Sequence, residues 1–157
     1  MAAGLGYALK LEKKDQYVYA IVGDGEINEG QFWEAAQFIA NYRLNHVIVM
    51  IDYNKRQLDG YTKDVMNPFD PAKKMEAFGF AVRTAAGADE EDISAAIDWA
   101  KGVQDQAVCI VLDTVKGQGV PYFEEMADNH SVKFTAADIE QVDAALRSLE
   151  KIAGGED

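Results

Sequence analysis

Hydrophobic and polar positions follow two different periodicities along the chain, and changes between them mark the predicted elements. Short apolar runs rich in β-branched residues, each bounded by turn residues, favour buried strands over helices. These runs cover residues 17–22, 46–51, 80–84 and 107–115. Around them, apolar residues recur at helical spacing. The helical segments cover residues 1–11, 28–42, 71–78 and 89–103, with a last one from Thr135 onward.

The alternating order of strands and helices predicts the fold class. It points to a three-layer α/β/α fold, in which helices cover both faces of a mainly parallel four-stranded sheet. With 157 residues the chain has room for a hydrophobic core, and we expect residues 1–157 to form a single domain. A hydrophobic content of 48% with only 3 prolines argues against disorder.

The first two predicted strands each end in residues that can bind a metal ion. Gly23, Asp24 and Gly25 follow the first strand, and Asn54 follows the second. Parallel strands joined by a helix place their carboxyl ends side by side, at the edge where open α/β sheets bind ligands. Carboxylate and amide oxygens suit magnesium or calcium, and magnesium fills its shell with phosphate oxygens and water. Glycines let a phosphate come close, and the N-terminus of the following helix favours an anion.

An Asp-Gly turn between a strand and a helix is also a common feature of proteins without any ligand there. The placement of Asn54 at the end of the next strand favours the binding interpretation over a plain turn. The sequence therefore predicts a diphosphate held through Mg²⁺ or Ca²⁺ at Asp24 and Asn54.

Charge and cysteine content narrow the classes of function. A formal net charge of −12 disfavours nonspecific binding to nucleic acid or to anionic membranes. No apolar run reaches the length of a membrane span, and no basic region precedes an apolar signal core. The one cysteine, Cys109, lies in the last apolar run, where apolar surroundings would keep its thiol inert. We expect a cytoplasmic protein without an internal disulfide.

The wording around these residues resembles a known family. GDG followed by Asn54, 30 positions after Asp24, is similar to the thiamine diphosphate-binding motif of thiamine enzymes. The longer strings GDGEINEGQFWEAA and NKRQLDG resemble transketolases, especially the bacterial kind split into two subunits, and TVKGQGV with His130 fits the same pattern. Pyruvate dehydrogenase-type enzymes and deoxyxylulose-phosphate synthases usually diverge after GDG. The resemblance covers essentially the whole chain and implies the fold of a diphosphate-binding domain.

The resemblance also implies roles for individual residues around the cofactor. Asp24 and Asn54 would bind the metal ion, and the main-chain carbonyl of Arg56 would complete its shell. Leu58 would lie against the thiazolium ring, with plain packing as an equal alternative. The residues expected near the diphosphate are Gly23, Asp24, Gly25, Glu26 and Asn54.

Two further residues receive catalytic roles from the resemblance. His130 matches a family histidine that contacts the diphosphate and approaches the substrate, although a lone loop histidine is most often exposed and idle. Glu29 matches an acid at the transketolase dimer interface, in a network that links the two active sites. The alternative for Glu29 is an acid that simply complements the helix dipole.

Taken together, these features imply a transketolase subunit or fragment that uses thiamine diphosphate to move a two-carbon ketol unit between sugar phosphates. Met1 falls inside a family domain, so an upstream segment of the family is absent from this sequence. The residues that activate the aminopyrimidine belong to another domain, so we expect a partner subunit with the pyrimidine-binding domain, or a homo-oligomer. The alternatives are another thiamine diphosphate enzyme component, of oxo-acid dehydrogenase or synthase type, and a noncatalytic remnant that binds a partner.

Overall fold

The computed structural model describes residues 1–126 and 129–154. The chain divides into two units, Met1–Thr114 and Val115–Asp157. The first unit contains the sheet and most helices, and the second contains two helices. The expectation of a single domain over residues 1–157 stays a prediction.

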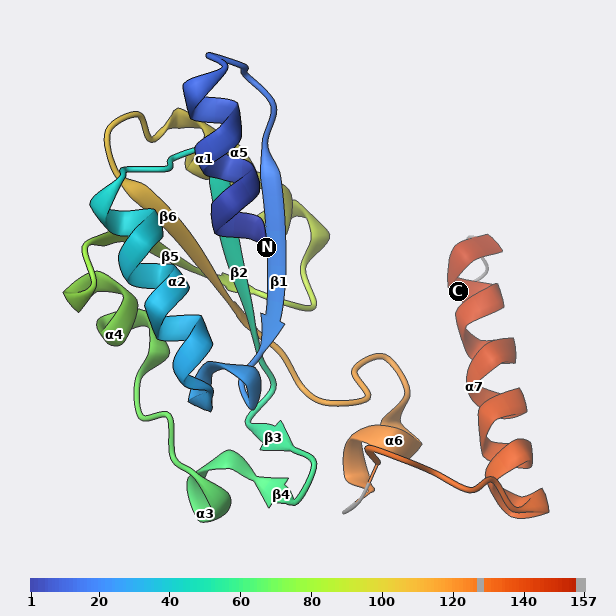
Figure 1. Ribbon diagram of the computed structural model, residues 1–157. Helices are drawn as coiled ribbons and strands as arrows, with labels where there is room; N and C mark the ends of the chain where they lie inside the picture. The colour runs from blue at the N-terminus through green and yellow to red at the C-terminus, as the bar shows by residue number, and fades with distance from the viewer. Residues whose placement is uncertain (127–128, 155–157) are drawn as a thin grey trace. The chain divides into compact units, whose positions relative to one another are not determined.

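A four-stranded sheet forms the centre of the first unit (Figure 1). Its strands lie in the order β1 (Val18–Gly23), β2 (Val47–Tyr53), β6 (Ala107–Asp113) and β5 (Phe80–Ala86). Every neighbouring pair is parallel, which confirms the predicted parallel sheet. Gly23 pairs with Asp52, and Tyr53 pairs with Asp113. The carboxyl ends of β1, β2 and β6 therefore meet at one edge of the sheet.

Helices cover both faces of this sheet, as predicted. Alternate residues of a strand point to opposite faces, and β2 shows this clearly. Val47, Val49 and Ile51 belong to one buried cluster, whereas Ile48 and Met50 belong to another. The first cluster packs against helices α1 (Ala2–Leu11), α2 (Gly30–Asn41) and α4 (Pro71–Ala77), and the second packs against α5 (Glu90–Gly102).

Strand β1 is an edge of the sheet and is covered on one face only. Val18 and Val22 pack into the cluster beneath α1 and α2. Tyr19 and Ile21, which alternate with them and so point to the opposite face, are exposed. The first unit thus presents an apolar strip along its edge strand.

The polar connection predicted after β2 contains regular structure that the sequence pattern did not indicate. Its elements are β3 (Arg56–Gln57), β4 (Gly60–Tyr61) and α3 (Thr62–Val65). The two short strands pair antiparallel, with Arg56 opposite Tyr61. The Arg56 guanidinium lies 4.4 Å from the centre of the Tyr61 ring, and Gly60 takes a φ of 136° that other residues rarely adopt. These two contacts explain how so short a hairpin forms.

The second unit contains α6 (Pro121–Glu125) and α7 (Ala136–Gly154). The predicted start of α7 at Thr135 is confirmed by a reciprocal cap. The Thr135 N–H and hydroxyl donate to Asp138 Oδ2 at 2.6 and 2.7 Å, and the Asp138 N–H donates to Thr135 Oγ1 at 3.3 Å. Helix α6 was not predicted, since five residues are too few to show a period.

Cys109 is confirmed as a core residue. It lies fully buried in β6, and burial raises the pKa of its thiol to about 12. The thiol therefore stays protonated and unreactive in the folded chain. Within the part of the chain that the structure describes, no helix has both the length and the apolar character needed to cross a membrane.

Candidate functional site

Asp24 is a buried carboxylate at the carboxyl end of β1. Only 1% of the residue is exposed, and its Oδ2 atom has no hydrogen-bond partner among the described residues. Burial raises the pKa of Asp24 to about 6, and the negative charge of Asp52 adds to that shift. Hydrogen bonds from the backbone N–H groups of Lys55, Gly25 and Arg56 act against it. Such an oxygen is suited to a cation, because buried polar atoms are otherwise nearly always paired.

The turn that carries Asp24 lies directly against the segment after β2. A Cβ atom added at Gly25 would come within 3.1 Å of Gln57 Cβ, so this close approach favours glycine there. The side chain of Asn28 donates to Gln57 Oε1 at 3.4 Å and adds a second link. Glu26 remains local, since its Oε2 accepts the Gly23 N–H at 2.8 Å.

Asn54 is half-buried and held at both ends of its amide. Its Nδ2 donates to Asp52 Oδ2 at 3.0 Å, and its Oδ1 accepts the Arg56 N–H at 3.0 Å. The Lys55 backbone takes a left-handed conformation with φ of 65°, which turns the chain sharply after β2. Lys55 Nζ reaches across to Asp113 and to the Thr114 carbonyl, the latter at 3.0 Å.

The structure brings the predicted metal residues together. The Asp24 carboxylate faces the backbone N–H groups of Lys55 and Arg56, directly after Asn54. One carboxylate, one amide oxygen and main-chain carbonyls form the hard-oxygen donor set that magnesium uses, together with phosphate and water. Residues 1–126 and 129–154 contain no cluster of three or more His, Cys, Asp or Glu side chains that could hold a metal. The donor set therefore fits Mg²⁺ or Ca²⁺ better than zinc.

Leu58 lies at the tip of the β3–β4 hairpin, between its two strands. It is 64% exposed, so it is not a core residue of this chain. This exposure removes packing within the folded chain as an explanation for the leucine. Its predicted contact with the thiazolium ring stays a prediction.

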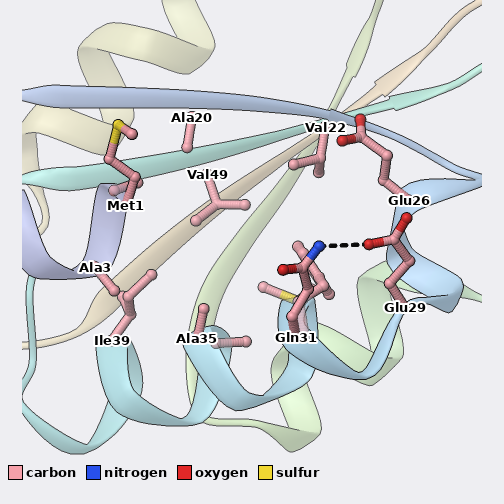
Figure 2. A pocket seen from close by; sticks show the side chains of 14 residues that line it. Met1, Ala3, Ala20, Val22, Glu26, Glu29, Gln31, Ala35, Ile39 and Val49 are labelled. Carbon is pink, nitrogen blue, oxygen red and sulfur yellow. Dashed lines mark hydrogen bonds between the residues drawn. The ribbon is translucent and has the colours of Figure 1, made fainter.

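Glu29 lies at one end of a cavity of about 400 Å³. Figure 2 shows that cavity between the start of α1, strand β1 and helix α2, with mostly apolar walls. Gln31 Nε2 donates to Glu29 Oε2 at 2.5 Å, and both side chains are exposed. Asp24 and Asn54 are not among the residues that line the cavity. Glu29 is thus separate from the predicted metal site.

His130 belongs to the second unit. Its side chain is exposed, and its Nδ1 lies 2.9 Å from Lys116 Nζ. Asn129 fixes the loop beside it by donating to the carbonyls of Phe123 at 2.7 Å and Lys116 at 3.2 Å. The local order of His130 is therefore explained, and its contact with a diphosphate stays a prediction.

Sequence reasoning did not select Asp52 and Thr114, which the structure places at the same sheet edge. The Thr114 hydroxyl donates to Asp52 Oδ1. The Asp24 N–H donates to the Asp52 carbonyl at 3.2 Å. Asp52 stands two positions before Asn54 at the end of a strand, and that spacing was the only signal for it in the sequence.

Comparison with known proteins decides the family. A family model described as the thiamine diphosphate binding domain of transketolase matches residues 8–149. The chain belongs to the transketolase family. It is 40% identical over 151 residues to the 6-deoxy-6-sulfo-D-fructose transketolase subunit SqwG of Clostridium sp. (strain MSTE9), covering 96% of this chain and 54% of that protein. It is 36% identical over 153 residues to an apulose-4-phosphate transketolase subunit of Actinobacillus succinogenes, covering 95% and 52%.

Solved transketolases share the fold. A Pichia stipitis transketolase in complex with sedoheptulose 7-phosphate superposes with a TM-score of 0.74 and 27% identity, over 91% of this chain and 23% of that one. The Campylobacter jejuni transketolase gives 0.69 and 26%, over 76% and 20%. The predicted thiamine diphosphate-binding fold is thereby confirmed. The chain spans about half the length of the curated transketolase subunits that it matches.

Proposed function

We propose that this chain binds the diphosphate of thiamine diphosphate through Mg²⁺ or Ca²⁺ and forms part of an enzyme that transfers a two-carbon ketol unit between sugar phosphates. The observation that carries the proposal is the buried Oδ2 of Asp24, which has no hydrogen-bond partner among the described residues. It lies at the sheet edge that Asn54 shares. Membership of the transketolase family supports the identity of the cofactor.

In this proposal the chain positions the cofactor, which supplies the carbanion chemistry when bound. Asp24, Asn54 and the main-chain carbonyl of Arg56 hold the metal ion. Leu58 offers an exposed apolar side chain to the thiazolium ring. The backbone of the Gly23–Glu26 turn lies beside the diphosphate, and the Glu26 carboxylate keeps that turn closed by accepting the Gly23 N–H.

Activity requires a partner in this proposal. Both relatives described above are named as subunits, and the chain spans about half of each. The exposed Tyr19 and Ile21 on the edge strand give an apolar strip suited to burial against another chain. Glu29 would join the interface between subunits, and His130 would contact the diphosphate and approach the sugar phosphate. A cytoplasmic location stays a prediction.

The buried carboxylate argues against the alternative of a noncatalytic remnant. An unpaired buried oxygen destabilises the folded chain unless something binds it. A protein that no longer bound a cation would gain stability by replacing Asp24 with a neutral residue. The presence of aspartate therefore favours a working site.

The test is calorimetric titration of the purified chain with thiamine diphosphate, with and without Mg²⁺. We expect magnesium-dependent binding by the native chain, lost in Asp24→Ala. The matched control is Asp89→Ala, in the corresponding turn after β5. Asp89 is exposed and its carboxylate accepts the N–H groups of Glu91 and Asp92, so its removal should spare binding. Absence of magnesium-dependent binding by the native chain would overturn the proposal.

A further inference from the structure

Asn54 can serve as a metal ligand only if its amide points the right way. The two ends of an amide are nearly equal in shape, but only the oxygen can bind a cation. Something must therefore set which end faces the ion. In this structure the Nδ2 end is fixed, because it donates to Asp52 Oδ2 at 3.0 Å. An ionised carboxylate accepts hydrogen bonds and cannot donate them, so it selects the NH₂ end of Asn54.

The oxygen end of Asn54 remains usable in that orientation. Oδ1 accepts one hydrogen bond, from the Arg56 N–H at 3.0 Å. An amide oxygen has two lone pairs, so one remains for a metal ion. The same Arg56 N–H group lies beside the Asp24 carboxylate. The oxygen of Asn54 is thereby turned toward the part of the site where Asp24 lies.

Asp52 is itself held in place from two neighbouring strands. Its Oδ1 accepts the hydroxyl of Thr114, which directly follows β6. Its main-chain carbonyl accepts the Asp24 N–H at 3.2 Å from the end of β1. The Thr114 N–H donates to the Tyr53 carbonyl at 3.3 Å and aligns the end of β6 with that of β2. Asp52 is therefore the point where three strand ends are joined.

We propose that Asp52, held by Thr114, is a positioning residue that orients the Asn54 amide with its oxygen toward the metal ion of the diphosphate site. Asp52 binds neither metal nor cofactor in this arrangement. It acts through its hydrogen bond to Asn54 Nδ2, and Thr114 fixes the carboxylate that makes that bond. The inference rests on the proposed function, because it presumes a metal ion at Asp24 and Asn54.

A purely electrostatic role is the competing explanation, since Asp52 also adds a negative charge beside the site. The chain offers a matched control for charge in Asp113, at the end of the neighbouring strand β6. Asp113 pairs with Lys55 and is exposed. Asp113→Asn removes one negative charge from the same sheet edge while the bond between Asp52 and Asn54 remains.

The experiment measures magnesium-dependent affinity for thiamine diphosphate by calorimetry. Asp52→Ala should weaken binding roughly 10- to 100-fold, as is typical when the partner of a metal ligand is removed. Asp52→Asn retains an acceptor oxygen without the charge, so it should weaken binding less than Asp52→Ala. Asp113→Asn should change affinity less than either variant. Equal losses in Asp52→Asn and Asp52→Ala, or an equal loss in Asp113→Asn, would overturn the inference in favour of charge.

Asn54→Asp provides the sharper test, because a carboxylate has an oxygen at both ends and needs no orienting partner. In that background, Asp52→Ala should leave affinity unchanged or improve it, since it also relieves repulsion between two carboxylates. A charge-only role predicts that Asp52→Ala weakens binding in both backgrounds, and that result would overturn the inference.

A spectroscopic readout works without cofactor. The side-chain amide signals of Asn54, identified by their loss in Asn54→Asp, should shift in Asp52→Ala and much less in Asp113→Asn. Unchanged Asn54 signals in Asp52→Ala would contradict the proposed bond. Failure of the native chain to bind would overturn the proposed function itself, whereas binding that all variants share would overturn this inference alone.

Discussion

Two buried aspartates, one in each unit, show opposite treatments of a carboxylate. Asp24 is 1% exposed, and its Oδ2 has no hydrogen-bond partner among the described residues. Asp138 is 9% exposed, and both of its oxygens are engaged. The Tyr122 hydroxyl donates to Oδ1, while the Thr135 N–H and hydroxyl donate to Oδ2.

The pKa values of the two carboxyls shift in opposite directions for this reason. Burial raises the pKa of Asp24 to about 6. Hydrogen bonds from Tyr122 and then Thr135 hold the pKa of Asp138 below its usual value. A carboxylate with all its partners stabilises the local fold, here the start of α7. One that lacks a partner destabilises the fold unless a ligand supplies it, which is the behaviour expected of a binding site.

The largest effect should come from neutralising Asp24. We expect Asp24→Asn to be more stable than the native chain by on the order of 1 to 3 kcal/mol at neutral pH, because a raised pKa of about two units penalises the charged form. Urea unfolding in the absence of cofactor and Mg²⁺ measures this. A variant less stable than the native chain would show that the unpaired oxygen carries no cost.

The dependence of stability on pH should separate the two aspartates. The folded pKa of Asp24, about 6, exceeds its ordinary value of 3.8, so between these values the folded chain holds more protons than the unfolded chain. Its contribution to the free energy of unfolding should therefore fall by about 1.4 kcal/mol per pH unit as pH rises through that window, and stay lost above it. Subtracting the curve of Asp24→Asn from that of the native chain isolates this contribution.

For Asp138 the sign is opposite. A lowered folded pKa gives stability that is present above the ordinary value of 3.8 and is lost as the pH falls below it. The difference between the native chain and Asp138→Asn should therefore vanish in acid. A difference that instead grew as the pH fell would contradict the assignment.

A smaller effect is expected from the cap of α7. Thr135→Ala removes the hydroxyl that exchanges hydrogen bonds with Asp138, which should cost about 1 kcal/mol of stability. Thr135→Ser keeps the hydroxyl and is the matched control. Helicity by circular dichroism during thermal unfolding measures the change, and equal melting of the two variants would show that the cap contributes nothing.

The sequence was sufficient for the sheet and for the pair Asp24 and Asn54. Both residues directly follow apolar runs, and parallel strands place such positions together whatever the detailed register. The link between Thr114 and Asp52 could not be predicted, because the two residues are 62 positions apart. It depends on β6 lying beside β2, and neither apolar run specifies its neighbour. The hairpin around Leu58 was missed for another reason, since strands of two residues are too short to show alternation.

The single thiol of this protein also gives access to its dynamics. Cys109 lies in the middle of β6, an interior strand of the sheet, and is fully buried. A reagent that modifies thiols can reach it only when that strand opens. The rate of modification under native conditions therefore reports the opening free energy of the central sheet without any engineered label. Comparing that rate with and without cofactor would show whether binding at the sheet edge tightens the sheet interior.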